Sequence, residues 1–240
     1  MDVLRVLALA LLPAAGNFAG GVLAELIPTS RRTLSRALHV AAGIIVAVVG
    51  VELMPEALEG AAPWLMVLGF CLGGTAFILL DAAMERFRGG GKATGPWLVY
   101  AAVFIDLFSD GLMIGVGSVV SFSLALVLAV GQVTADVPEG FAAIANFRDK
   151  GVARSERLVL SASFVAATLL GASVGYWLLR DQSQATQVTA LAFTAGLLIL
   201  AAVEEMLGEA HEATEDCRIT AAFFVGGFAL FTLVASYFEA

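Results

Sequence analysis

Eight apolar stretches, separated by short polar segments, dominate the chain. They cover residues 3–27, 38–58, 63–84, 96–119, 122–147, 158–179, 188–208 and 220–237. A helix needs about 20 apolar residues to cross a bilayer, whereas a spanning strand needs about 9–11 residues of alternating character. Only helices and closed barrels satisfy all their backbone hydrogen bonds in lipid. The pattern therefore predicts an all-α membrane protein, an eight-helix transmembrane bundle that forms one domain over residues 1–240.

The composition supports lipid as the solvent of this chain. Hydrophobic residues make up 60% and charged residues 14%, whereas a soluble domain carries about 25% charged residues. The net charge of −8 argues against a nucleic-acid partner. Cys71 and Cys217 have neither metal-ligand nor disulfide-framework spacing. The spans contain no nucleophile–base pair and no phosphate-binding loop, so we expect no enzyme.

Lys and Arg lie almost entirely on one side of the eight-span arrangement. Only Arg5 and Arg180 fall on the other side; the remaining 11 of 13 lie in the first, third, fifth and seventh loops. Because cytoplasmic loops are enriched in Lys and Arg, we predict a prokaryotic inner-membrane protein with both termini outside. Residues 85–95 then form a short cytoplasmic linker. The first stretch resembles a secretory signal, but it stays apolar to Ile27 and basic residues follow it, which favours a retained span.

Two pairs of segments resemble each other across the chain. Val51–Glu59 (VELMPEALE) aligns without a gap to Glu204–Glu212 (EEMLGEAHE), and Asp106–Gly111 (DLFSDG) resembles Asp136–Gly140 (DVPEG). The members of each pair belong to spans that cross the membrane in opposite directions. Such antiparallel similarity is typical of carriers built from inverted repeats, and we predict inverted repeats here.

Acidic residues near the middle of the spans are the main candidates for chemistry. An ionised carboxylate at this depth costs about 2.5–3.5 kcal/mol by insertion scales. No Lys or Arg lies at a similar depth, so protons or bound cations must neutralise the acids. The acids are Asp106, Asp110, Asp136, Glu139 and Glu205, with Glu52 and Glu204 close behind.

Helical spacing brings these acids onto shared faces. Asp106 and Asp110 are four residues apart in the fourth span, and Gln132, Asp136 and Glu139 follow one another at i, i+4 and i+7 in the fifth. Oxygen ligands from two or three helices around one point are typical of a site for a hard divalent cation.

The fifth span also carries a helix-breaking residue beside its acids. Pro138 cannot donate a hydrogen bond to the carbonyl of Thr134, which frees a backbone oxygen within one turn of the carboxylates. Gly111 and Gly140 directly follow acids and allow neighbouring helices to approach closely.

Further acids near the span ends are candidates for an ion pathway. Glu52, Glu56 and Glu59 would attract cations at the outer mouth, and Glu209, His211 and Glu212 could receive them on the inner side. Gln132 and Glu204 are further candidates for the pathway. The run HEATED that begins at His211 could equally be a solvated acidic face.

The chain resembles the ZIP (Zrt-, Irt-like) family of metal transporters in span number, in termini placed outside and in adjacent fourth and fifth spans. The sharpest local match is ADVPEG (135–140), which resembles the fifth-span motif ending in Pro-Glu-Gly. DLFSDG resembles the fourth-span motif His-Asn-x-x-(Asp/Glu)-Gly, and EEMLGE (204–209) resembles the seventh-span Glu-x-x-Pro-Glu. The resemblance implies a binuclear metal site in which Asp110, Asp136, Glu139 and Glu205 occupy ligand positions.

The departures from the family pattern bear on the ion. The fourth-span histidine is Asp106 here, the asparagine after it is Leu107, and the seventh-span proline is Gly208. Imidazole suits Zn²⁺, whereas sites built only of oxygen suit harder ions. We therefore expect a site that retains one metal position, is weaker in the second, and favours harder ions than zinc.

The expected function is a carrier that moves a divalent cation of the zinc, iron or manganese class toward the cytoplasm, with lipid and metal ions as its partners. Two alternatives stay open: a proton-coupled carrier of another small solute, and a membrane metal sensor or scaffold that does not transport. Gly69, Gly73 and Gly74 of the third span could form a homodimer face or pack internally.

Overall fold

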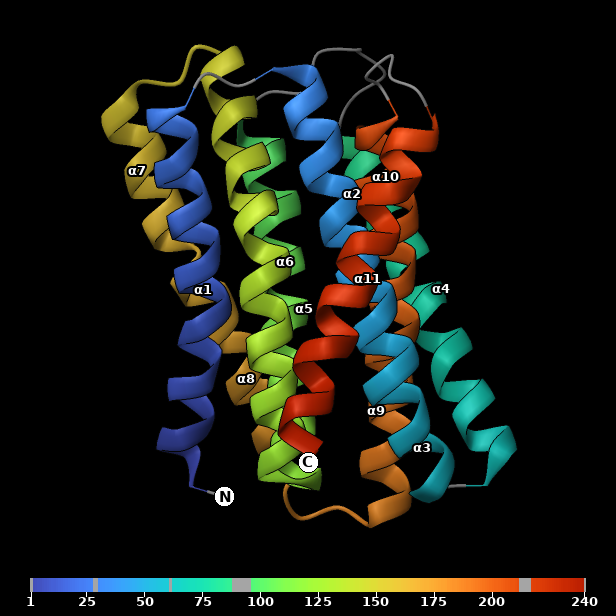
Figure 1. Cartoon of the computed structure of the whole chain (residues 1–240). Coiled ribbons are helices and arrows are strands. Elements are labelled where there is room, and N and C mark those ends of the chain that lie inside the picture. The colour runs from blue at the N-terminus through green and yellow to red at the C-terminus, as the bar shows by residue number, and fades with distance from the viewer. Residues whose placement is uncertain (1, 28–29, 61, 88–95, 212–216, 240) are drawn as a thin grey trace.

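The computed structural model describes residues 2–27, 30–60, 62–87, 96–211 and 217–239, and within them it is helical without strands (Figure 1). Eight helical stretches of these residues are long and apolar enough to cross a membrane, which confirms the predicted all-α fold. They are Val3–Leu26, Arg31–Gly60, Pro63–Met84, Pro96–Val120, Phe122–Asp149, Arg154–Leu179, Gln184–Ala210 and Arg218–Phe238. Of the predicted linker 85–95, residues 88–95 lie outside the described residues, and 85–87 continue the helix of the third span. Glu212, a candidate for the pathway, also lies outside the described residues.

Five spans are single helices, and the other three consist of successive segments. The single helices are α1 (Val3–Leu26), α4 (Pro63–Phe87), α5 (Pro96–Val120), α6 (Phe122–Asp149) and α11 (Cys217–Glu239). The second span joins α2 (Arg31–Ala47), η1 (Val48–Leu53) and α3 (Met54–Gly60). The sixth joins α7 (Arg154–Ser163) and α8 (Val165–Leu179), and the seventh joins α9 (Gln184–Leu200), η2 (Ala201–Met206) and α10 (Leu207–Ala210). Both η1 and η2 are π-helices of six residues, a wide turn that is frequent at functional sites.

Serine caps begin three of the helices. Ser30 accepts a hydrogen bond from the backbone N–H of Thr33, and Ser183 accepts one from Thr186. Ser121 is the single residue between α5 and α6, and its hydroxyl accepts from the N–H of Leu124 at 3.0 Å. Each cap satisfies one of the N–H groups that a helix start leaves without an intrahelical partner. The cap at Ser121 thus lets α5 and α6 form a tight antiparallel pair.

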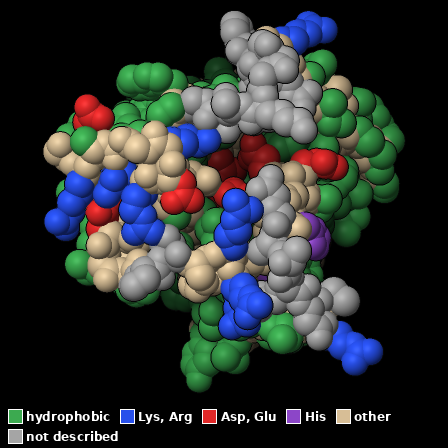
Figure 2. Space-filling model, turned by 90° about the horizontal axis from the view of Figure 1, so that it is seen from above, with side chains coloured by type: hydrophobic (Ala, Val, Ile, Leu, Met, Phe, Trp, Pro, Cys, Tyr) green, Lys and Arg blue, Asp and Glu red, His purple; other side chains and the backbone are tan. Residues whose placement is uncertain are grey.

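The two ends of the bundle differ in charge. Both chain termini lie at the lower end in Figure 1, here called the terminal end. The opposite end, here called the basic end, carries the described Lys and Arg side chains of the first, third, fifth and seventh loops, and Figure 2 shows several of them around a hollow with acidic side chains inside it. The described residues therefore follow the charge distribution that the sequence predicted.

Helices α1 and α6 meet backbone to backbone through glycines. A Cβ added to Gly140 would lie 1.8 Å from the carbonyl oxygen of Asn17, and one added to Gly20 would lie 1.9 Å from that of Val137. Both distances are too short for any side chain. The same reciprocal arrangement recurs in α5/α8 (Gly111 to Thr168, Gly171 to Phe108), in α2/α11 (Gly43 to Phe224, Gly227 to Val40) and in α4/α9 (Gly73 to Phe193, Gly196 to Phe70), each at 1.9–2.2 Å.

These glycine contacts repeat at fixed intervals, as inverted repeats require. The π-helices η1 and η2 begin 153 residues apart, at Val48 and Ala201, and Gly43 and Gly196 are also 153 residues apart. Helix α2 starts at the basic end, whereas α9 starts at the terminal end (Figure 1). The second and seventh spans are therefore equivalent segments that run in opposite directions.

The glycines of the third span serve internal packing. A Cβ on Gly69 would lie 2.6 Å from the carbonyl oxygen of Thr189, and one on Gly73 would lie 1.9 Å from that of Phe193, both on α9. Of the two uses that the sequence left open for them, the structure shows packing within the chain. A homodimer stays a prediction.

An ion pair fastens α1 to α7 at the basic end. Arg157 Nε lies 2.5 Å from Glu25 Oε1, and both side chains are less than a tenth exposed. Arg157 also donates to the carbonyl of Val152, and Arg148 donates to that of Ala24.

We expect the substitution Arg157→Met to destabilise the fold more than the double substitution Glu25→Gln, Arg157→Met. The single change leaves the Glu25 carboxylate with only the more distant Arg154, whose Nε lies 3.5 Å from Oε2 and whose side chain is exposed. We expect a cost between the roughly 1 kcal/mol of an exposed pair and the 3–5 kcal/mol of a buried one. Unfolding in mixed micelles with increasing dodecyl sulfate measures the difference. A double variant as unstable as the sum of the two single variants would show that the pair itself contributes nothing.

Candidate metal centre

Helices α5 and α6 place the acids at the centre of the bundle. One carboxylate oxygen from each of Asp106, Asp110 and Glu139 lies within 4.8 Å of the other two. This group contains members from both helices because the one-residue connection at Ser121 holds them antiparallel, and because i, i+4 spacing keeps Asp106 and Asp110 on one face. The predicted faces of the fourth and fifth spans do meet.

The other two polar residues of α6 complete the surroundings of this group. The side-chain amide of Gln132 donates a hydrogen bond to Asp110. Asp136 is fully buried. Asp136 nevertheless lies outside the three-acid group. Pro138 lies within α6, as the sequence requires, one turn from the carbonyl of Thr134.

The acids are deeply buried, yet several of their oxygens have no hydrogen-bond partner among the described residues. Asp110 is 1% exposed, Asp136 0% and Glu139 8%. Among the described residues, no hydrogen-bond partner reaches Asp110 Oδ2, either oxygen of Asp136, or Glu139 Oε1. Buried polar groups are almost always paired, because an unpaired one costs free energy. The chemistry of this donor set, several oxygens without a partner around one point, fits a divalent cation.

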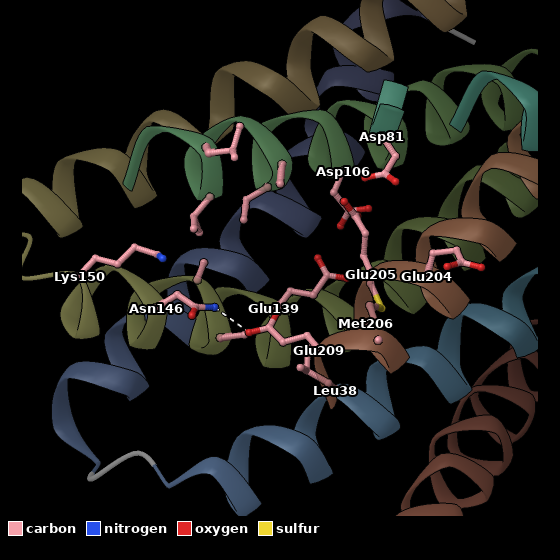
Figure 3. A pocket seen from close by; sticks show the side chains of 17 residues that line it. Leu38, Asp81, Asp106, Glu139, Asn146, Lys150, Glu204, Glu205, Met206 and Glu209 are labelled. Carbon is pink, nitrogen blue, oxygen red and sulfur yellow. Dashed lines mark hydrogen bonds between the residues drawn. The ribbon is translucent and has the colours of Figure 1, made fainter. Parts of the chain in front are cut away.

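A cavity of about 690 Å³ leads from these acids to the basic end. Asp106 and Glu139 lie at its inner end, and Asp81 of α4 and Glu205 of η2 join them there. Figure 3 shows these four carboxylates directed toward the same part of the cavity. Acids from four spans therefore converge on the place where the cavity ends.

The remaining predicted pathway residues lie farther from this convergence. Glu204 lines the cavity but is exposed and points away from the other acids (Figure 3). Glu209 also lines the cavity and accepts a hydrogen bond from Asn146 at 2.7 Å. His211 is exposed, and its ring packs edge-on against that of His39 with 5.3 Å between centroids.

Glu52 and Glu56 lie on the opposite side of the bundle. Glu52 belongs to η1 and is 7% exposed, and Glu56 belongs to α3 near the terminal end. Neither lines the cavity.

Sequence reasoning missed two charged side chains that line the cavity. Asp81 lies three residues before the predicted end of the third span at residue 84, and Lys150 was counted only among the basic residues that set the orientation. Measuring the depth of Asp81 from the basic loop that follows it would have placed it near the level of Glu205, on a neighbouring span that runs in the same direction. Sequence periodicity within one helix cannot reveal such a contact between helices.

Comparison with known protein families matches residues 85–235 to the ZIP zinc transporter family. No curated protein matches the chain. The matched region includes α5, α6 and the seventh span, and thus the three segments whose motifs resemble the family's. Because the match covers more than half of the 240 residues, this membrane-spanning chain belongs to the ZIP zinc transporter family, whose members transport divalent metal ions.

Proposed function

We propose that this protein carries a divalent transition-metal cation, of the zinc, iron or manganese class, across a prokaryotic inner membrane toward the cytoplasm. The observation that carries the proposal is the set of buried carboxylate oxygens of Asp110, Asp136 and Glu139 that lack hydrogen-bond donors among the described residues. A bound cation neutralises the negative charge of these buried carboxylates. Membership of a metal-transporter family supports the same function.

In this proposal Asp106, Asp110, Asp136, Glu139 and Glu205 replace the water around the ion at mid-membrane. The cavity, whose walls carry Glu209 and Asn146, is the way out at the basic end. That end faces the cytoplasm, because the described Lys and Arg side chains gather there. The helix pairs fastened by glycines, α1/α6 with α5/α8 and α2/α11 with α4/α9, form two groups that move against each other around the site.

Uptake of Mn²⁺, Fe²⁺, Zn²⁺ and Cd²⁺ into proteoliposomes tests this function directly. Saturable uptake of any of these ions, absent from protein-free vesicles, is expected. No saturable uptake under conditions where a histidine-containing relative transports in parallel would contradict the proposal and favour a sensor or scaffold that only binds metal.

A proton-coupled carrier of another solute is the second candidate, because protons would also neutralise the acids that lack donors. It predicts a proton flux that does not depend on metal and that Glu139→Gln abolishes. A pH-sensitive dye inside the vesicles distinguishes the two functions.

The substitution Asp106→His is expected to shift ion preference toward zinc. Asp106 contributes one oxygen of the three-acid group, and imidazole suits Zn²⁺ better than it suits Mn²⁺. We expect the ratio of kcat/KM for Zn²⁺ to that for Mn²⁺ to rise at least about tenfold, because losing even an outer partner of a metal ligand changes affinity or activity about 10–100-fold. The variant Asp106→Asn controls for the lost charge, and an unchanged ratio in the histidine variant would show that position 106 does not select the ion.

A further inference from the structure

The cavity opens only at the basic end. The inverted repeats that form it are related by a twofold rotation that exchanges the basic end with the terminal end. Each residue of one repeat has a counterpart, which is the residue at the equivalent position of the other repeat. The number of residues between counterparts is 153 for the second and seventh spans, as from Gly43 to Gly196. It is 29 residues between α5 and α6, where Gly111 and Gly140 make equivalent contacts, and 154 residues between α4 and α11, from Gly73 to Gly227.

Counterparts of the residues that line the cavity form the closed core on the other side of the site. Leu38, Met206, Ala142, Ala143 and Asp81 line the cavity. Their counterparts all belong to one apolar cluster and are at most 1% exposed. The pairs are Leu38 with Leu191, Met206 with Leu53, Ala142 with Met113, Ala143 with Ile114 and Asp81 with Ala235. The part of the core between the acids and the terminal end is therefore the closed equivalent of the open cavity.

One acid stands out among these counterparts. Glu205 occupies the fifth position of η2, and Glu52 occupies the fifth position of η1. Glu205 lies in the open cavity, whereas Glu52 is 7% exposed and directly precedes Leu53 of the closed core. Of the other acids at the cavity's inner end, Asp81 corresponds to Ala235 and Asp106 to Ala135, whereas Glu139 corresponds to Asp110, which already belongs to the three-acid group.

We propose that Glu52 is the cation-binding acid of the opposite access route, equivalent to Glu205 on the present one. In the conformation open to the terminal end, the apolar contacts around Leu53, Met113 and Ile114 separate. Glu52 then lies in a cavity that leads from the terminal end to Asp110, and it takes a divalent cation toward that carboxylate. This inference rests on the proposed transport function and adds the residue that serves the other half of the cycle.

The two routes make separate demands on transport from the two faces of a vesicle. For oriented proteoliposomes, we expect Glu52→Gln to raise the KM for Mn²⁺ or Zn²⁺ supplied at the terminal end by about tenfold and to leave the KM from the basic end within about twofold. Glu205→Gln removes one of the proposed mid-membrane ligands and should therefore raise the KM from both ends. For Glu52→Gln, equal changes from both faces, or no change from either, would overturn the inference even while the wild type transports.

Thiol labelling tests the same route without relying on flux. In a background where serine replaces Cys71 and Cys217, Leu53→Cys should react with a membrane-impermeant reagent at the terminal end. The matched control is Ala41→Cys on the same span, because neither Ala41 nor its counterpart Thr194 lines the cavity. A minor conformation populated at about 0.1–10% suffices for labelling. Equal protection of both cysteines would overturn the inference. Labelling of Leu53→Cys in a protein without metal flux would uphold the second route and count against metal transport alone.

Discussion

Replacement of Glu139 by alanine is expected to abolish saturable metal uptake while the protein still folds. Glu139 belongs to the three-acid group, borders the cavity and has an oxygen without a hydrogen-bond donor among the described residues. Loss even of an outer partner of a metal ligand lowers activity about 10–100-fold, so the loss of a contacting oxygen should cost at least that much. Initial uptake rates in proteoliposomes, with equal protein incorporated, measure the effect.

Two further variants separate charge from folding. Glu139→Gln keeps the volume of the side chain but removes its negative charge, and it should lose uptake as well. Its thermal stability should equal or exceed that of the wild type, because burying a carboxylate beside two other acids costs free energy that the neutral amide does not. Glu156→Gln, an exposed acid of α7, should transport normally. A Glu139→Ala protein that retains half of the wild-type rate would show that this carboxylate is not a transport ligand.

Addition of a single methyl group at Gly227 or at Gly140 is expected to destabilise the bundle severely. A Cβ at Gly227 would lie 2.2 Å from the carbonyl oxygen of Val40, and one at Gly140 would lie 1.8 Å from that of Asn17. Backbone atoms cannot rotate away, so the helices must separate. Overpacking costs about 1–3 kcal/mol where side chains adjust, and we expect values at or above the upper end. Melting temperatures in detergent measure the loss.

The chain offers a matched control one residue away. Gly226 lies on the same helix as Gly227, and a Cβ there would meet no atom of the described residues within 4 Å. Gly226→Ala should therefore leave the melting temperature unchanged or raise it slightly, because alanine favours helix more than glycine does. Equal melting temperatures for the variants at Gly226 and Gly227 would mean that the backbone contact does not hold α2 and α11 together.

Periodicity predicted the parts of the site that lie within single helices. Asp106 and Asp110, and Gln132 with Asp136 and Glu139, lie on the faces that their spacing indicates, because an α-helix fixes the direction of each side chain from its position. The count of eight spans followed from the lengths of the apolar stretches. These features depend on local sequence alone.

Periodicity could predict neither the contacts between helices nor the departures from α-helical geometry. Asp81 joins the acids only because α4 packs on α9 through Gly73 and Gly196, and nothing within the third span indicates this partner. The π-helix η2 was not predicted, and its wider turn shifts the directions of Glu204 and Glu205 from those of an α-helix. Two adjacent glutamates give no sequence signal for that shift.

The lysine at the mouth of the cavity has a consequence for the dependence of cation exit on salt. Lys150 lines the cavity at the basic end together with Glu204, Glu205 and Glu209. The cavity therefore joins an acidic interior to a surface rich in Lys and Arg. The positive potential of that surface repels a departing cation, and the repulsion weakens as added salt shortens the Debye length.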